Sequence, residues 1–221
     1  MRIMSIFTLT MLCFISFTNF ACDKYMQIIG NGIIKKENRV LQTFDEIKID
    51  GSMDLIAICG TAQKVELEAD SNLISLIKTD VIDKTLHVYS ENNYSSKNNQ
   101  VIYISIDNLS KITLNGSSSI KISDLSNELF EISINGSGNI KADGKTKVFN
   151  IDINGSGSIQ SEKLEAKNVY VNISGSGNAE IKAIDTLDIS ITGSGNVIFS
   201  GDPNITNQEI VGSGSITKRQ I

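Results

Sequence analysis

The sequence of 221 residues has no tryptophan, and aromatic residues make up only 6% of it. Because Trp and Tyr supply many protein-binding hot spots and many platforms for sugar stacking, the composition indicates neither kind of site strongly. Histidine occurs once, as His87 in an apolar stretch, so a histidine-based metal site and Ser-His-Asp chemistry both lack support. A strand histidine with an ordinary structural partner explains His87 better.

Cysteine and basic residues are also scarce. Cys13 falls in an N-terminal apolar segment and Cys22 follows that segment, which leaves Cys59 alone and predicts no intrachain disulfide. With one histidine in the chain, Cys59 is expected to be a small buried residue and not a nucleophile. The 20 Lys and Arg against 25 Asp and Glu give a formal net charge of −5 without a basic stripe, which argues against nucleic acid as a partner.

Residues 1–21 are typical of a signal peptide, because Arg2 precedes an apolar run that is too short and wrongly flanked for a membrane span. Two outcomes of export stay open: lipidation of Cys22 after cleavage, and ordinary secretion. The polar tether at residues 22–32 favours the lipoprotein, although Phe20 fits the cleavage motif of lipoproteins poorly. The protein is therefore expected to be exported to the cell envelope, as a lipoprotein of the outer membrane or the periplasm.

The second half of the chain is rich in one repeat. Gly-Ser-Gly, or a near copy, recurs at intervals of 20, 19, 20, 18 and 19 residues. The first glycines of these tripeptides, here named the corner glycines, are Gly116, Gly136, Gly155, Gly175, Gly193 and Gly212. A period this regular means that the chain builds one small unit and stacks it.

Apolar residues alternate with polar ones around each corner glycine, as in a strand with one buried face. Ile151 and Ile153 precede Gly155 in this way, and Ile159 follows it. A third apolar anchor occurs nine residues after the corner glycine in three repeats, as Leu125, Leu164 and Ile184.

The repeat length decides between fold classes. A unit of about 19 residues is too short for a pair of helices. The pattern therefore predicts an all-β chain, a right-handed single-stranded parallel β-helix (solenoid) in which each isoleucine lies on that of the next coil. The alternative is an antiparallel meander or barrel with one hairpin per repeat. Because identical residues recur in register, like-on-like stacking and hence the β-helix are favoured.

Asn and Ser flank the corner glycines, for example Asn135 and Asn139 around Gly136. Stacked side chains of this kind can form hydrogen-bonded ladders along the coil axis. Two interpretations follow: a polar ridge that binds a sugar or a partner protein, and turn residues that are present for local reasons only. The second interpretation is simpler, so the corner glycines are predicted to be structural.

The β-helical domain is expected over residues 33–217, with an irregular capping region at 33–106 and the repeat coils at 107–217. Within the capping region, residues 44–58 show strand, Gly-Ser and strand in the order of the repeat, and so predict an early coil. A solenoid needs covered ends, because open strand edges promote aggregation. Residues 72–82 fit a short helix or an irregular apolar segment that could cover the first coil.

The remaining expectations concern a loop and the last coil. Residues 90–100 are polar and rich in Asn and Ser, which predicts a loop. In the last coil, Gln208 interrupts the apolar ladder, and Lys218 and Arg219 are expected to blunt the strand edge. The only proline, Pro203, falls in the connection to this coil, where no ladder hydrogen bond is lost.

No catalytic, metal-binding or cofactor-binding residue is predicted. The acidic residues fall at different offsets from the corner glycines, and the Gly-Asp nonapeptide of calcium-binding β-helices is absent from the sequence. Gly-Ser-Gly is not a phosphate loop, because no Lys-Ser or Lys-Thr follows it. The lack of candidate catalytic residues in the sequence therefore argues against an enzyme, although a carbohydrate-active β-helix enzyme stays an alternative.

Two segments carry a family resemblance. One is the entry segment "TFDEIKIDGSMDLIAICGTAQKVELEADSNLISLIKTDVIDKTLHVYS", and the other is the run of "INGSGNI", "INGSGSI", "ISGSGNA" and "ITGSGNV". Together they resemble the family described as putative auto-transporter adhesins with a head GIN domain, over residues 41–216. The resemblance implies a right-handed parallel β-helix, export to the envelope and an adhesive or binding role. It transfers no functional residue, since the recurring motif is structural.

We therefore expect a non-catalytic envelope binding or adhesion module that presents a repetitive β-helix face to a glycan or a protein. Its link to the membrane is expected through the lipid on Cys22, and exposed end coils could pair copies into a homo-oligomer. Besides the enzyme, the other alternative is an envelope assembly or stress component.

Overall fold

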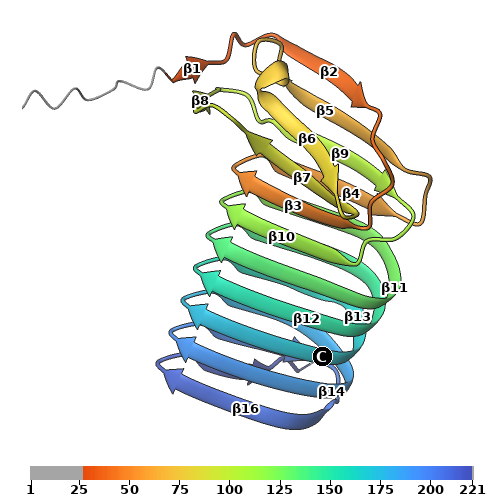
Figure 1. The fold of residues 1–221 in the computed structure, drawn as a ribbon. Coiled ribbons are helices and arrows are strands. Elements are labelled where there is room, and N and C mark those ends of the chain that lie inside the picture. Colours follow the sequence, from red (N-terminus) through yellow and green to blue (C-terminus); the bar gives the residue numbers. More distant parts are fainter. Residues whose placement is uncertain (1–26, 221) are drawn as a thin grey trace, which may run out of the picture.

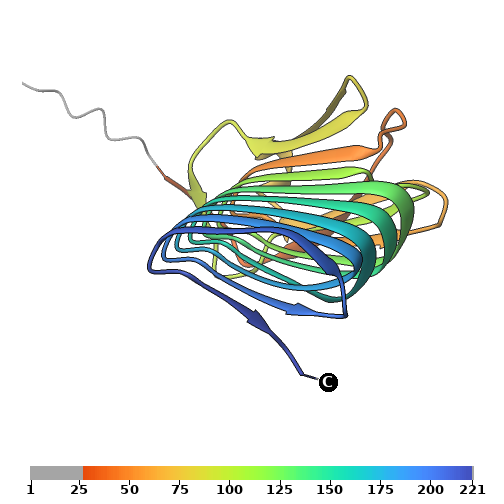
Figure 2. The ribbon, with the colours of Figure 1, turned by 90° about the horizontal axis from the view of Figure 1, so that it is seen from below.

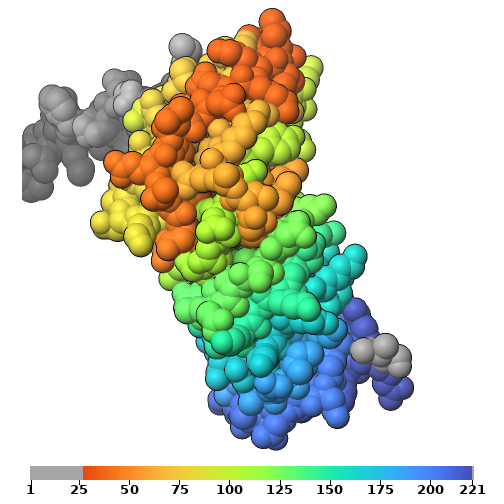
Figure 3. Space-filling view, turned by 90° about the vertical axis from the view of Figure 1, so that its right-hand side faces the viewer, coloured from red at the N-terminus to blue at the C-terminus, as the bar shows by residue number. Residues whose placement is uncertain are grey.

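The computed structural model describes residues 27–220, so the predicted signal peptide and Cys22 lie outside the described residues. Within them the chain is all-β, with parallel strands stacked into a solenoid, as the repeat predicted (Figure 1). The stack is elongated, with a head at the N-terminal end and the last coil at the other (Figure 3). The coils are formed by β10 (Lys111–Gly116), β11 (Ser119–Gly136), β12 (Asn139–Gly155), β13 (Ser158–Gly175), β14 (Asn178–Gly193), β15 (Asn196–Ser200), β16 (Asn204–Gly212) and β17 (Ser215–Lys218).

Successive coils pair in parallel and in the register of the repeat. On the strand segments before the corner, Ile132 of β11 lies beside Ile151 of β12, which lies beside Val171 of β13. The corner glycines lie beside one another in the same way from β10 to β16. The antiparallel alternative is therefore wrong for the repeats, since all their pairings are parallel.

The inward residues of these strands form the core. The ladder isoleucines are almost completely buried from coil to coil, and Phe130 stacks on Phe149 with ring centroids 5.6 Å apart. Full burial of each such side chain stabilises the fold by about 1.5–3 kcal/mol. Because every coil covers the inward face of its neighbour, these contributions depend on the stack and not on any single unit.

The third apolar anchor differs from the prediction in one repeat. Leu125 and Leu164 are buried as expected, but Ile184 is 42% exposed, and Ala183 is the buried residue at this level. The cause is a shift of register between β13 and β14, where Ala166 pairs with Ala183. The interval between corner glycines is shortest in this repeat, at 18 residues. Fewer residues are therefore available for the bend between the two strand segments of this coil.

The head consists of β1 (Ile28–Ile29), β2 (Ile34–Arg39), β3 (Glu46–Gly51), β4 (Asp54–Cys59), β5 (Lys64–Asp70), β6 (Ile77–Ile82), β7 (Thr85–Ser90), β8 (Tyr94–Ser95) and β9 (Val101–Ile106). β3 lies parallel to β10, with Gly51 beside Gly116, and β4 lies parallel to β11. The early coil predicted at residues 44–58 is thus present. β7 and β9 lie parallel to β3 and β4 in turn. The outer pairs are antiparallel: β6 with β7, β5 with β9, and β2 with β5.

Two head segments correct the sequence expectations. Residues 72–82 do not form a short helix across the first coil. They contain a 3-10 turn at Ile74–Leu76 and then strand β6, which extends the sheet beside β7. The β-branched residues of β6 suit this strand, and its pairing with β7 outweighs the weak helical pattern. The predicted loop at 90–100 holds the short strand β8, which pairs with β1 inside the predicted tether.

Candidate binding surfaces

The corner glycines are positioned for backbone reasons. Their φ angles lie between +125° and +147°, a region that other residues rarely adopt. Each also packs directly on the corner below, so that a Cβ on Gly155 would overlap the carbonyl oxygen of Gly136. The backbone amide that follows each corner donates to a glycine carbonyl of the neighbouring coil, as Ser156 does to Gly136 at 2.9 Å. Glycine is therefore needed both for the bend and for the close stacking of coils.

Amide side chains beside the corners form the ladder that the sequence suggested. Asn115 donates to Asp50 at 2.6 Å, Asn135 to Asn115 at 2.9 Å, and Asn154 to Asn135 at 3.2 Å. A second ladder after the corner includes Asn196, which donates to Asn178 at 3.0 Å. These bonds give the ladder a structural role in the stack. Its exposed polar atoms form the first candidate binding surface, the coil face.

A second candidate surface lies within the head, between the corner of the early coil (β3 and β4) and the segment from the end of β7 to the start of β9. A cavity of about 180 Å³ is lined by Asp50, Gly51, Ser52, Met53, Val88, Tyr89, Ser90, Asn92, Asn93 and Tyr94. A neighbouring cavity of about 340 Å³ is lined by Ser52, Asp54, Tyr94, Ser95, Ser96, Asn98, Asn99 and Gln100. The two share Ser52 and Tyr94, and together they are here named the junction cleft. It combines aromatic rings with carboxylate, amide and hydroxyl groups.

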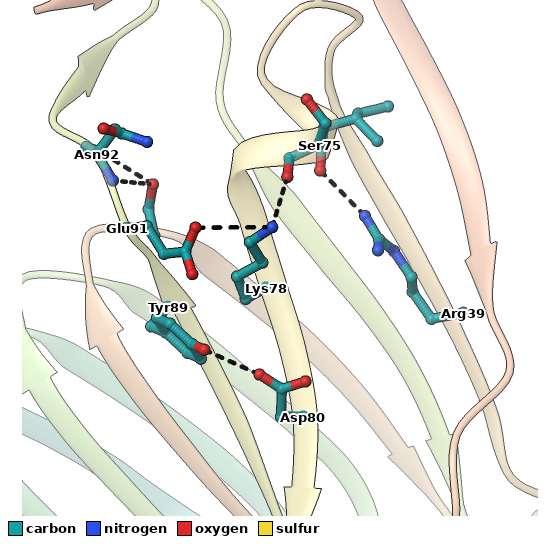
Figure 4. Close-up of polar contacts among 9 residues, drawn as sticks. Arg39, Ser75, Lys78, Asp80, Tyr89, Glu91 and Asn92 are labelled. Carbon is teal, nitrogen blue, oxygen red and sulfur yellow. Dashed lines mark hydrogen bonds and ion pairs between the residues drawn. The ribbon is translucent and has the colours of Figure 1, made fainter.

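Polar contacts hold the edge of the sheet around Tyr89, which lines the junction cleft (Figure 4). Lys78 of β6 forms an ion pair with Glu91 at 3.8 Å and donates to the Ser75 carbonyl at 3.2 Å. The Tyr89 hydroxyl donates to Asp80 at 2.9 Å, and this bond to the protonated hydroxyl raises the pKa of Tyr89. Burial raises the pKa of Tyr94. Both tyrosines are therefore neutral in the physiological range.

Two residues that line the cleft, Ser96 and Asn98, are anchored on Asp70, the last residue of β5. Its carboxylate is buried and accepts hydrogen bonds from Ser96 and from Asn98, the latter at 2.7 Å. These two bonds, with a further one from the Gly32 backbone, hold the pKa of Asp70 below its ordinary value of 3.8, although burial opposes them. Gly30 passes close over this carboxylate, where a side chain would overlap it. One buried carboxylate thus joins β5 to the segment at residues 96–98 and to the segment at residues 30–32.

This network predicts an acid-sensitive head. Because the folded-state pKa of Asp70 is lowered, its contribution is fully present above the unfolded pKa of 3.8 and is lost as pH falls through the lower folded value. We expect the free energy of unfolding to fall more steeply below about pH 4 in the wild type than in Asp70→Asn. Urea denaturation across a pH series measures how the free energy of unfolding depends on pH in the two proteins. Equal slopes for the two proteins would contradict a role for the ionised carboxylate.

Cys59 and His87, the two reactive residue types considered in the sequence, occupy structural positions. Cys59 is buried at the end of β4, and burial, with the nearby Asp124 and Asp143 charges, raises its pKa to about 11. It is therefore a thiol and a poor nucleophile at neutral pH. His87 lies in β7 between Lys48 of β3 and Asp80 of β6. Over residues 27–220, no group of His, Cys, Asp and Glu is arranged to hold a metal ion, and no helix is long and apolar enough to cross a membrane.

The junction cleft was not predicted from the sequence. Most of its lining comes from residues 90–100, which the sequence identified only as a polar loop. The available signal was the pair of tyrosines, Tyr89 and Tyr94, within a segment dense in Asn and Ser. Loops carried by a rigid scaffold are a common place for binding residues. The coil face, in contrast, followed directly from the repeat.

Comparison with known proteins supports the fold and the family. The chain is similar to solved structures of a putative adhesin from Bacteroides fragilis NCTC 9343 (TM-score 0.70, 19% identity, covering 87% of this chain and 100% of that chain) and of a putative adhesin from Parabacteroides merdae ATCC 43184 (TM-score 0.54, 17% identity, covering 88% and 99%). A putative lipid binding protein from Parabacteroides distasonis ATCC 8503 shares 25% identity at a TM-score of 0.56, over 88% of this chain and 100% of that chain.

A search of curated proteins finds no significant match. The model of one family, in contrast, matches residues 43–203, which include the head from β3 onward and the stacked coils through β15. The parallel stack, the corner glycines and this match agree. The chain belongs to the family described as putative auto-transporter adhesin, head GIN domain.

Proposed function

We propose that the protein is a non-catalytic binding module of the cell envelope that takes a glycan at the junction cleft. The observation that carries the proposal is the gathering of Tyr89 and Tyr94 with Asp50, Asn92 and Asn93 around one cavity. Tyrosine rings offer an apolar face to a sugar ring, and carboxylate and amide groups pair with its hydroxyls. The adhesin-like family supports binding in preference to catalysis.

The rest of the molecule serves this role as a stiff support. The coils form a rigid, continuous stack. Export followed by lipidation at Cys22 would tether this stack to a membrane. A binding site on a rigid scaffold loses little conformational entropy when it binds. The coil face, with its rows of Asn and Ser, is the second surface that a glycan or a protein partner could use.

A polar ligand fits the cleft better than a lipid. The Parabacteroides distasonis relative is described as a putative lipid binding protein. In this chain both cavities of the junction cleft are lined mainly by Asp, Asn, Ser and Tyr. Acyl chains prefer apolar walls, whereas these groups would lose hydrogen bonds with water against a lipid chain. A hydroxyl-rich ligand restores those bonds.

The proposal is tested by screening a glycan array with the chain that lacks residues 1–21. The glycan that binds best is then titrated into the wild type and into two variants. Asn93→Ala removes an amide from the cleft, and we expect it to weaken binding by about tenfold. Tyr170→Ala is the control, because Tyr170 is a 45% exposed tyrosine on β13 in the repeat coils and lines neither cavity of the cleft. It should leave affinity unchanged. Loss of binding in Tyr170→Ala alone would move the site to the repeat coils and overturn the proposal for the cleft.

A further inference from the structure

The C-terminal end of the solenoid is open. β16 pairs only with β14, and β17 only with β15, so among residues 27–220 neither strand has a partner on its outer side. Figure 2 looks along the stack at this end, with the last coil nearest the viewer. All nine residues of β16 are exposed, whereas the strands above it alternate between buried and exposed positions.

The apolar ladders end at this surface. Ile205 lies beside Leu187, and Ile210 beside Ile191, so both continue the buried rows of β14. Leu187 and Ile191 are completely buried, but Ile205 and Ile210 are 45% and 40% exposed. Val211, next to the corner, is 58% exposed. The last apolar side chains of the core ladders are therefore exposed at this end, beside the unpaired edge of β16.

Two edge strands of the large sheet in the head carry charges that discourage pairing, and β16 carries fewer. β2, at one edge of the head, has four charged residues among six, and β6, at another, has Lys78 and Asp80. β16 has one charged residue among nine, Glu209. Lys218 and Arg219, expected from the sequence to blunt this edge, form ion pairs with Asp202 at 2.8 Å and with Glu180 at 2.5 Å, which offset part of their charge.

We propose that a second copy of this chain covers the open coil, tail to tail, with β16 paired antiparallel to β16 of its copy. Charge supports a self-contact. Residues 201–219 hold two acids, Asp202 and Glu209, and two bases, Lys218 and Arg219, so this coil is formally neutral in a chain of net charge −5. Two such ends meet without net repulsion, while the acidic remainder of the two chains stays apart.

The geometry limits the assembly to two copies. A two-fold axis across the sheet sets the β16 strands antiparallel and brings the ends of both isoleucine ladders together, so the contact is the same patch on both chains. The opposite end of the stack is the head, whose edge strands β2 and β6 carry charged residues and pair antiparallel with their neighbours. The contact therefore closes on itself and gives a dimer, not a filament.

Analytical ultracentrifugation of the secreted chain carrying Cys22→Ser, at several concentrations, tests the proposal. We expect twice the mass of one chain. Gln208→Lys places like charges near the two-fold axis and should raise the dissociation constant of the dimer by at least about tenfold. Ile184→Lys is the matched control, because Ile184 is 42% exposed on the side of the stack. It should not change the mass.

Disulfide cross-linking gives a second readout that does not depend on a destabilising change. In the same Cys22→Ser background, Gln208→Cys should form disulfide dimers in mild oxidant, while Ile184→Cys should not. Cys59 does not interfere, since it is buried with a raised pKa. A monomer at all concentrations, or equal cross-linking at positions 208 and 184, would overturn the proposal. Either result would leave the proposal for a glycan site in the junction cleft unaffected.

Discussion

Replacing Gly155 by alanine is expected to lower the free energy of unfolding by about 2–6 kcal/mol. Two costs combine. The φ of +131° is strained for any residue with a side chain, which costs about 1–3 kcal/mol. The new methyl group also overlaps the Gly136 carbonyl of the coil below, and overpacking of this kind costs about 1–3 kcal/mol. Urea denaturation followed by circular dichroism measures the change, because the chain has no tryptophan to report on unfolding.

Gly51→Ala separates the two costs. Gly51 has nearly the same φ, +128°, and lies in the same row of corners, but a Cβ there would meet no atom within 4 Å. We expect it to cost only the strain, about 1–3 kcal/mol. If Gly51→Ala proved as damaging as Gly155→Ala, close stacking of the corners would not be what requires glycine in the middle of the solenoid.

Truncating Phe149 to alanine is expected to destabilise the protein by about 3–5 kcal/mol. The ring is buried in the centre of the stack and lies against Phe130 at an interplanar angle of 15°. Its loss removes buried apolar surface, leaves a cavity that the rigid coils cannot fill, and ends the stacking contact. Because each coil depends on its neighbours, a defect in the middle of the stack weakens the coils on both sides.

Leu129→Ala is the control for this change. Leu129 precedes Phe130 on β11 but points outward and is 41% exposed. Its truncation should change the free energy of unfolding by no more than about 0.5–1 kcal/mol. Both variants are compared by the same urea denaturation. Similar losses for Phe149→Ala and Leu129→Ala would mean that the solenoid core carries far less of the stability than its burial implies.

Much of the fold could be predicted from the chain alone, and the reason is physical. A period of two within each strand and of about 19 between strands leaves one arrangement in which every isoleucine is buried, so Ile132, Ile151 and Val171 had to lie beside one another. The error at Ile184 arose where the period shortened. There the corner-to-corner spacing no longer fixed which residue turns inward, and the register with β13 decided it.

The head could be predicted less well, because its pattern is not periodic. Residues 72–82 were ambiguous between helix and irregular structure, and only the presence of β7 beside them made a strand the favourable state. The short strands β1 and β8 are each too small to be recognised in the sequence, and they exist through their mutual pairing. In such segments, contacts between residues far apart in the chain outweigh local propensity.

The sequence by itself determined the coil: the parallel stack, the corner glycines and the buried ladders all follow from one repeated unit whose local preferences agree with its packing. Only the tertiary structure decided the two ends. The junction cleft exists because Asp50 and Tyr94, 44 residues apart in the sequence, line one cavity. The last coil is open because β16 has no strand on its outer side among the described residues. Repetition specifies how a coil meets a copy of itself, but not what meets the first and last coils.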